Sequence, residues 1–115
     1  MTGVGSVNFA DWERLDLRVA EIKKAEDIKG ADKLYKLTLD VGKEIGEKVI
    51  CAGIKPYYKK TYLKNKKIIY FANLASRMMK GIESQGMLLA ASTKDLKKVV
   101  LIRPEKDIEN GAKIG

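Results

Sequence analysis

The residues from Tyr35 to Val41 have the most regular pattern in the chain. Apolar side chains occupy every second position of this stretch, and Lys36, Thr38 and Asp40 occupy the positions between them. Successive side chains of a β-strand point to opposite faces, so this alternation predicts a strand with one buried face. Because a single strand cannot bury that face alone, we expect it to belong to a larger sheet.

Five other segments have strand-like patterns. They are residues 15–20, 49–52, 68–72, 87–91 and 99–102. The first of them alternates, whereas the other four are continuous apolar runs. Continuous apolar runs are typical of strands that are covered on both faces, here by loops or by a partner.

Two short helices and several turns separate these strands. A helix is expected over Phe9–Arg14, capped by Ser6 or Asn8, and a second over Lys60–Lys64. Turns are expected at Gly42, Gly46 and Asn110–Gly111.

The order of these elements predicts a fold class. A helix between the third and fourth strands is the arrangement of the oligonucleotide-binding (OB) barrel. We therefore expect an all-β fold with short helices: a five-stranded OB barrel with an N-terminal helix and a C-terminal extension. The 115 residues suit one domain, 1–115, with the core at about 9–92 and the extension at 93–115.

The chain lacks the residues on which most active sites depend. It has no histidine and a single cysteine, which excludes the usual zinc sites and a cysteine–histidine nucleophile pair. It also has no Gly-Lys-Ser/Thr phosphate loop. We therefore expect no catalytic residues, no metal and no cofactor. Cys51 lies in the apolar run 49–52 and is expected to be a buried, unreactive thiol.

The sequence shows no membrane-directed segment. Its apolar runs are far shorter than the roughly 20 residues that cross a bilayer. Residues 1–9 lack the basic cluster and the long apolar stretch of a secretory signal. We expect a cytoplasmic protein with no membrane partner.

The net charge is +8, and all but four of the basic residues are lysines. An excess of this size favours polyanions as partners, and lysine suits phosphate backbones better than base edges. The alternative is that surface lysines only keep the protein soluble. Overall charge alone does not decide between the two.

Basic residues concentrate in the segment from residue 55 to 67, which contains no acid. From it we take a supporting basic patch of Lys55, Lys59, Lys60 and Lys64. Three tyrosines lie between these lysines, at positions 57, 58 and 62. They would either stack on bases or pack the helix against the sheet, and we favour packing.

Residues 73–87 join two apolar strands and carry unusual residues for an exposed loop. Gly81 and Gly86 permit positive φ or a close approach of the backbone. Met78 and Met79 would either form an adaptable apolar contact or fold back into the core.

Residues 80–92, KGIESQGMLLAAS, resemble the signature of the tRNA-binding domain family. Four other pieces resemble that family in the same order: DLRV at 16–19, ADKLY at 31–35, CAGI at 51–54 and ANL at 72–74. The resemblance extends from about Phe9 to the C-terminus. The family includes stand-alone dimeric tRNA-binding proteins, the appended C-terminal domain of many methionyl-tRNA synthetases, and domains of eukaryotic synthetase cofactors.

The resemblance implies an OB barrel that grips the outer corner of tRNA by shape and backbone, which suits a lysine-dominated surface. The tRNA-binding residues that it implies are Lys33, Asn73, Arg77, Lys80, Ser84, Gly86 and Met87. We assign phosphate contacts to the three cations. The assigned role of Asn73 and Ser84 is hydrogen bonding to sugar or phosphate, and Met87 would make an apolar contact or shape the loop.

The resemblance also implies the assembly and the partner. Stand-alone members are homodimers, and the Phe9–Arg14 helix and the region beyond Thr93 are the expected dimer contacts. Because 115 residues hold no synthetase catalytic domain, we expect the chain to act in trans and to assist a methionyl-type aminoacyl-tRNA synthetase. Its tRNA binding is expected to be structure-specific and largely independent of sequence.

The chain departs from the family at three places. Residues 28–30 replace a common His-Pro pair, and 51–52 stand where a serine is frequent. Residues 60–63 stand where Pro-Glu-Glu-Leu is common, which exchanges acid for base and should strengthen polyanion binding.

Two alternative functions stay open. One branch of the same family is an export-related chaperone that binds unfolded peptides, and Met78 and Met79 would suit such a surface. The other alternative is a module whose main role is to dock on a methionyl-tRNA synthetase. The net charge of +8 and the sequence MLLAAS at residues 87–92 favour tRNA over peptides as the ligand.

Overall fold

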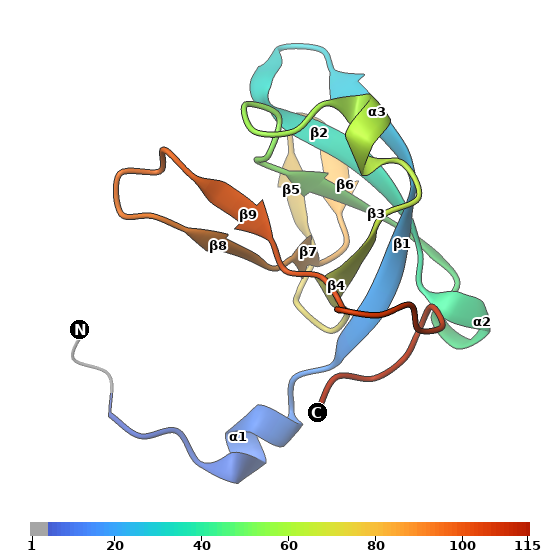
Figure 1. Ribbon diagram of the computed structural model, residues 1–115, viewed down its shortest axis with the longest axis vertical. Coiled ribbons are helices and arrows are strands. Elements are labelled where there is room, and N and C mark those ends of the chain that lie inside the picture. Colours follow the sequence, from blue (N-terminus) through green and yellow to red (C-terminus); the bar gives the residue numbers. More distant parts are fainter. Residues whose placement is uncertain (1–4) are drawn as a thin grey trace.

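A five-stranded antiparallel sheet forms the centre of the computed structural model, which describes residues 5–115 (Figure 1). The strand order is β3-β2-β1-β4-β7. The strands of this sheet are β1 Leu17–Ile28, β2 Ala31–Asp40, β3 Glu47–Ala52, β4 Lys67–Phe71 and β7 Met87–Leu88. The predicted class, mostly β with few short helices, is therefore confirmed.

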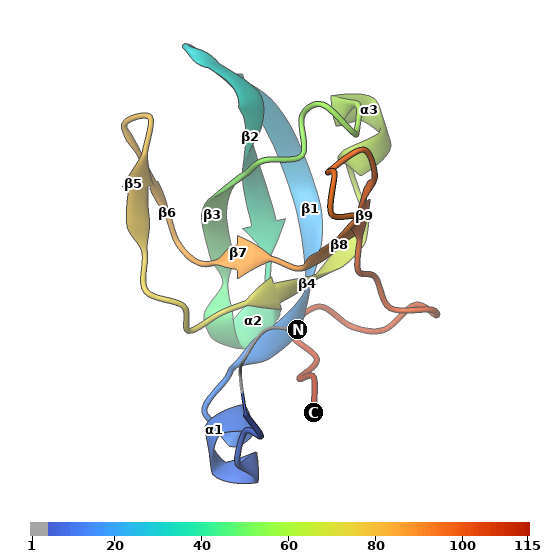
Figure 2. The same cartoon turned by 90° about the vertical axis from the view of Figure 1, so that its left-hand side faces the viewer.

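Two hairpins and three short helices surround the sheet (Figure 2). The hairpins are β5 Arg77–Met79 with β6 Ile82–Ser84, and β8 Ala90–Ser92 with β9 Val99–Leu101. The helices are α1 Phe9–Glu13, α2 Gly42–Ile45 and α3 Lys60–Leu63. Within residues 5–115, no helix has the length and apolar composition that crossing a membrane requires.

β1 is the longest strand and is shared between two halves of the sheet. Its residues 17–21 pair with β4, and its residues 21–28 pair with β2. The register shifts between Ile22 and Lys24, and such an irregularity lets a strand bend. The bend lets one strand belong to both halves of a strongly curved sheet.

The C-terminal extension pairs with the first residues of β1, on the side that does not pair with β4. Gly111 N–H donates to the Val19 carbonyl at 2.7 Å, and Ile114 N–H donates to the Leu17 carbonyl at 2.9 Å. The predicted turn at Asn110–Gly111 is confirmed, with φ of 90° at the glycine. The end of the extension, expected at the dimer contact, thus pairs with its own chain.

The core confirms the alternation from which the fold was predicted. Tyr35, Leu37 and Leu39 are buried in the main cluster, whereas the polar residues between them are only half-buried. In β4, Ile68 belongs to this cluster and Ile69 belongs to a second cluster on the other face. The continuous apolar run of β4 is therefore covered on both faces, as predicted.

Two elements of the structure differ from the prediction. The apolar run 87–91 is not one strand but two, because the chain leaves the sheet at Leu89, where β7 ends and β8 begins. Ala90 and Ala91 are exposed, so β8 is not covered on both faces in this chain. Turns were predicted at Gly42 and Gly46, and both glycines have positive φ. The short helix α2 that lies between them was not predicted.

The edge of β3 faces the end of β6 and the residue that follows it, without forming a strand ladder with them. Cys51 N–H donates to Ser84 Oγ at 3.0 Å. Val49 N–H donates to Gln85 Oε1 at 3.0 Å, and the Gln85 N–H donates to the Val49 carbonyl at 2.8 Å. The sheet is therefore open where a closed barrel was expected, and two side-chain hydrogen bonds and one backbone hydrogen bond take the place of the missing ladder.

Candidate functional site

The β5–β6 hairpin carries the centre of the site. Its two-residue turn is Lys80–Gly81, with φ of 52° and 82°. Positive φ at both central positions is the geometry of a type I′ turn, which matches the twist of paired strands. The segment expected to be a loop is thus a hairpin with Lys80 exposed at its tip.

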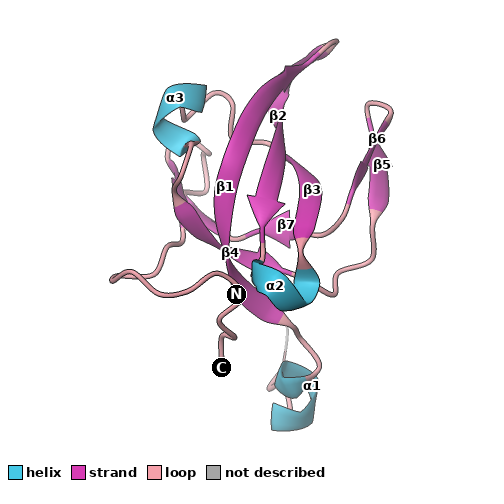
Figure 3. Cartoon of the chain, turned by 90° about the vertical axis from the view of Figure 1, so that its right-hand side faces the viewer, coloured by secondary structure: helices cyan, strands magenta, loops and turns pink. Residues whose placement is uncertain are grey.

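One side of this hairpin packs against the sheet, on the right of Figure 3. Met79 and Ile82 contact a buried cluster of Ile28, Ala31 and Cys51. Met78 points away and is 66% exposed. Met79 therefore folds back, as one of the two interpretations expects. Met78 faces solvent, and an adaptable apolar contact through it stays a prediction.

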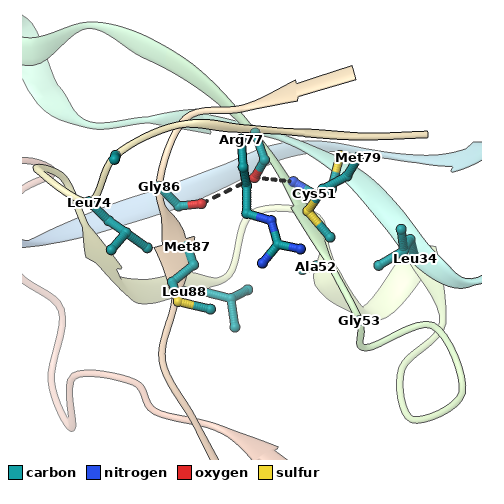
Figure 4. A pocket seen from close by; sticks show the side chains of 12 residues that line it. Leu34, Cys51, Ala52, Gly53, Leu74, Arg77, Met79, Gly86, Met87 and Leu88 are labelled. Atoms are coloured by element: carbon teal, nitrogen blue, oxygen red, sulfur yellow. Dashed lines mark hydrogen bonds between the residues drawn. The ribbon is translucent and has the colours of Figure 1, made fainter. Parts of the chain in front are cut away.

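An open cavity of about 280 Å³ lies between the hairpin and the sheet. Its walls are mainly apolar side chains from β2, β3, β5 and β7, with the 74–75 loop closing one side. Figure 4 shows Arg77 extending into the cavity, between Met87 and Leu88 on one side and Ala52 and Leu34 on the other. Arg77 is an exposed residue, and its guanidinium points toward apolar walls.

The floor of the cavity is fixed by hydrogen bonds. Ser84 is 2% exposed, accepts from the Cys51 N–H and donates to the Gly86 carbonyl at 3.1 Å. The Tyr70 hydroxyl donates to the Gln85 carbonyl, and burial raises the pKa of Tyr70. In this structure Ser84 shapes the site, while its hydroxyl bonds to backbone groups of Cys51 and Gly86.

Gly86 occupies a position that no side chain fits. Its φ is 101°, and a Cβ there would lie 2.4 Å from the Phe71 carbonyl oxygen. Both predicted uses of a glycine, a positive φ and a close approach, meet at this one residue. The backbone can therefore turn sharply beneath the cavity.

Two cations lie beside the cavity. Lys33 and Lys80 line an adjoining hollow together with Asp32, and Leu34 lines both the hollow and the cavity. In the described part of the chain, neither lysine forms an ion pair, and nor does Arg77. Three charges are thus free to meet a ligand's anions.

The two remaining predicted residues differ in their placement. Met87 is 50% exposed and lines the cavity. Asn73 holds the link between α1 and β1: its side chain accepts from the Asp16 N–H at 2.8 Å and donates to the Arg14 carbonyl at 2.7 Å. Six of the seven predicted residues therefore surround the cavity and its hollow, and the side-chain amide of Asn73 is used elsewhere.

The supporting basic patch has an acidic partner that the local sequence does not show. Asp27, from the end of β1, pairs with Lys60 at 2.5 Å and Lys55 at 3.1 Å. Both hydrogen bonds lower the pKa of Asp27, and the bond from Lys60 has the larger effect. The bond between Asp27 and Lys60 also raises the pKa of Lys60. Lys59 and Lys64 are exposed and make no ion pair within residues 5–115.

The tyrosines of this segment mostly hold structure together. Tyr58 stacks on Tyr62 at 5.5 Å and accepts a hydrogen bond from the Leu101 N–H. Tyr57 donates to the Leu96 carbonyl in the β8–β9 turn. The packing interpretation agrees with these contacts, although Tyr62 remains 45% exposed.

Cys51 lines the cavity but is only 6% exposed. Burial raises the pKa of its thiol, which disfavours the reactive thiolate. The prediction that Cys51 is buried is confirmed, and its lack of reactivity stays a prediction. Leu34, Ala52 and Met79 were missed as wall residues. For Leu34 a signal existed, because it is apolar on the polar side of the alternating strand.

The fold and the site define a small, mostly β domain that presents free cations around an apolar cavity. The family model described as "Putative tRNA binding domain" matches residues 17–113. The chain therefore belongs to the tRNA-binding domain family, and the resemblance drawn from its motifs is confirmed. Membership supports tRNA binding and describes a binding domain rather than a catalytic one.

Individual relatives agree with this assignment. Methionine–tRNA ligase from Pyrococcus horikoshii is 46% identical over 108 residues, which are 94% of this chain and 14% of that protein. The chain thus spans only a small part of the curated relatives it matches.

Two solved structures resemble the whole chain. The MetRS related protein from Pyrococcus horikoshii has a TM-score of 0.89 at 35% identity, covering 97% of this chain and 100% of that one. The CsaA chaperone protein from Picrophilus torridus has a TM-score of 0.86 at 37% identity, covering 96% of this chain and 100% of that one.

Proposed function

We propose that this protein binds tRNA through the edge formed by the β5–β6 hairpin and the start of β2. The observation that carries the proposal is the group of three exposed or cavity-lining cations, Lys33, Arg77 and Lys80, without ion-pair partners in residues 5–115. Membership of the tRNA-binding domain family supports the choice of tRNA among polyanions.

The chemistry of this edge favours recognition by shape and backbone. Lysine side chains contact phosphates as point charges, and each contact releases counterions from the RNA. Among residues 5–115, no acidic side chain lines the cavity, and Asp32 is the one acid of the adjoining hollow. Binding is therefore expected to be structure-specific and largely independent of base sequence.

The proposal extends to a role in trans, without catalysis, beside a methionyl-type synthetase in the cytoplasm. Relatives named methionine–tRNA ligase carry a matching region that amounts to 14% or 16% of their length. In those relatives the matching domain is covalently part of the enzyme, whereas this chain would supply the same surface separately. A pull-down with a methionyl-tRNA synthetase tests this part.

We further propose a homodimer. α1 has only five residues and none of them is buried, and isolated helices of that length are unstable in water. Phe9 is 71% exposed and Trp12 is 39% exposed on it, and Val100 of β9 is 53% exposed. A second copy would cover such apolar side chains.

Fluorescence anisotropy of labelled bulk tRNA over a salt series tests the main proposal. Preferential binding whose log affinity falls linearly with log salt, at about 0.7–0.9 per phosphate contact, is the expected result. Absence of tRNA binding at low salt would refute it.

A chaperone role is the second candidate function. It is favoured by the structural similarity to the CsaA chaperone protein and by the apolar walls of the cavity. Affinity for an unfolded protein that persists at high salt would support it, because apolar contacts are not screened by salt.

A further inference from the structure

We propose that the cavity beneath Arg77 receives one unstacked base of the bound RNA, while the neighbouring cations hold its phosphates. This inference rests on the proposed tRNA binding and adds a specific contact to it. The juxtaposition that carries it is an apolar cavity with a guanidinium inside and two free lysines beside it (Figure 4).

The size of the cavity suits a single flat ring. Cavities for drug-sized ligands measure about 300–1,000 Å³, and this one, at about 280 Å³, is at the lower limit. Its walls are aliphatic and thioether side chains, with Leu34 opposite Met87 and Leu88. Such walls contact the faces of a base without reading its edge, which fits recognition independent of sequence.

Arg77 supplies the polar contact that a base needs. Its planar guanidinium can stack on a base or donate to carbonyl and ring-nitrogen acceptors. Among residues 5–115 no carboxylate competes for it. Its hairpin partner across the strands is Ser84, whose hydrogen bonds fix the hairpin to β3.

The surrounding charges favour RNA over an unfolded peptide as occupant. A base in the cavity brings at least one phosphate on each side along its strand. Lys80 and Lys33 line the hollow that shares Leu34 with the cavity, so they lie where such phosphates would pass. An apolar peptide side chain would fill the cavity but would leave these cations without partners.

The cavity is preformed, so little ordering is needed on binding. Its floor is held by the Ser84 and Tyr70 hydrogen bonds and by the close approach at Gly86. A rigid site loses less conformational entropy when its ligand arrives. One base contact can therefore strengthen a mainly electrostatic complex.

The test compares two end-labelled RNA hairpins that share one backbone and charge, one with normal loop bases and one with abasic loop positions. The wild-type protein is expected to bind the normal loop about 2- to 30-fold more tightly, the range expected for a guanidinium stacked on a ring. The salt dependence of the two RNAs should be the same, because their phosphates are identical.

Ala75→Leu blocks the cavity from its exposed side, since Ala75 lines it without being buried. In this variant the two hairpins should bind equally, with an unchanged salt slope. Ala91→Leu is the matched control, because it adds the same bulk at an exposed position of β8 outside the cavity. It should keep the wild-type preference.

A loop 2-aminopurine gives an independent readout. Its fluorescence should rise on binding to the wild type, because it leaves its stack for walls that contain no aromatic ring. If both hairpins bind the wild type equally while tRNA binding keeps its salt slope, the base contact is wrong and the tRNA proposal stands. If Ala75→Leu abolishes binding of an unfolded peptide but leaves the base preference intact, the cavity belongs to peptides and the inference is overturned.

Discussion

Gly86 and Ser84 show how single residues set the shape of the site. The sequence predicted that Gly86 would allow positive φ or a close approach, and both occur. It assigned Ser84 to RNA contact, whereas the hydroxyl in this structure bonds to Cys51 N–H and the Gly86 carbonyl. A pattern shows which residue type stands at a position, but the backbone groups that face it come from distant strands.

Gly86→Ala should destabilise the fold by roughly 2–4 kcal/mol, from backbone strain and overpacking together. The added Cβ would meet the Phe71 carbonyl at 2.4 Å. Gly53→Ala is the control, because its nearest neighbour is Leu34 at 3.9 Å and its φ is not positive. Urea unfolding of both variants checks this, and equal stability of the two would contradict the close approach.

Ser84→Ala should lower the free energy of unfolding by about 1–3 kcal/mol, because it leaves a buried N–H without its acceptor. The tRNA affinity of the folded variant should fall little, because Ser84 as a whole is only 2% exposed and its hydroxyl is out of reach of the RNA. Ser76→Ala, at an exposed position, serves as the comparison. A large loss of affinity with unchanged stability would restore Ser84 as a direct contact.

At the scale of elements, periodicity predicted the strands better than the site. The strands 35–41, 49–52 and 68–72 were found because each buries a face that the sequence marks. The β5–β6 hairpin was missed because its turn is Lys80–Gly81 rather than the usual Asn-Gly or Asp-Gly. Five of the seven predicted site residues lie around that hairpin, so the motif brings them together in space, and their role in binding stays a prediction.

Lys80→Asn should weaken tRNA binding severalfold and lower the salt slope by about 0.7–0.9, the loss of one phosphate contact. Asparagine tolerates the positive φ of this turn position, so the hairpin should persist. Lys80→Arg keeps the charge and should bind nearly as the wild type does. An unchanged salt slope in Lys80→Asn would place the RNA elsewhere.

Asp27→Asn should raise tRNA affinity roughly two- to fivefold at low salt, because it frees Lys55 and Lys60 for phosphates. Lys60 and Lys55 lower the pKa of Asp27 in the folded protein. Its ion pairs are therefore fully formed above the pKa that Asp27 has in the unfolded chain, and they are lost as the pH falls through its pKa in the folded protein. The difference between variant and wild type should therefore be constant at about pH 6–8 and shrink in acid. Asp107→Asn, which releases only Lys67, is the comparison.

For the whole molecule, the proposed homodimer rests on the exposed apolar side chains of α1. Phe9→Ser should convert a dimer of about twice 12.8 kDa into a monomer without unfolding it, because α1 contains no buried residue. Tyr62→Ser removes an exposed aromatic on α3 and should leave the dimer intact. Light scattering that gives 12.8 kDa for the wild type would contradict the proposed homodimer.

Competition at physiological salt tests the central claim, that this surface is built for tRNA, most directly. Labelled tRNA bound to the protein is challenged with unlabelled tRNA, duplex DNA and an unfolded protein, and its anisotropy is followed. We predict displacement by unlabelled tRNA at far lower concentrations than by either of the others. Displacement by the unfolded protein at concentrations equal to or below those of tRNA would contradict the account and favour the chaperone role.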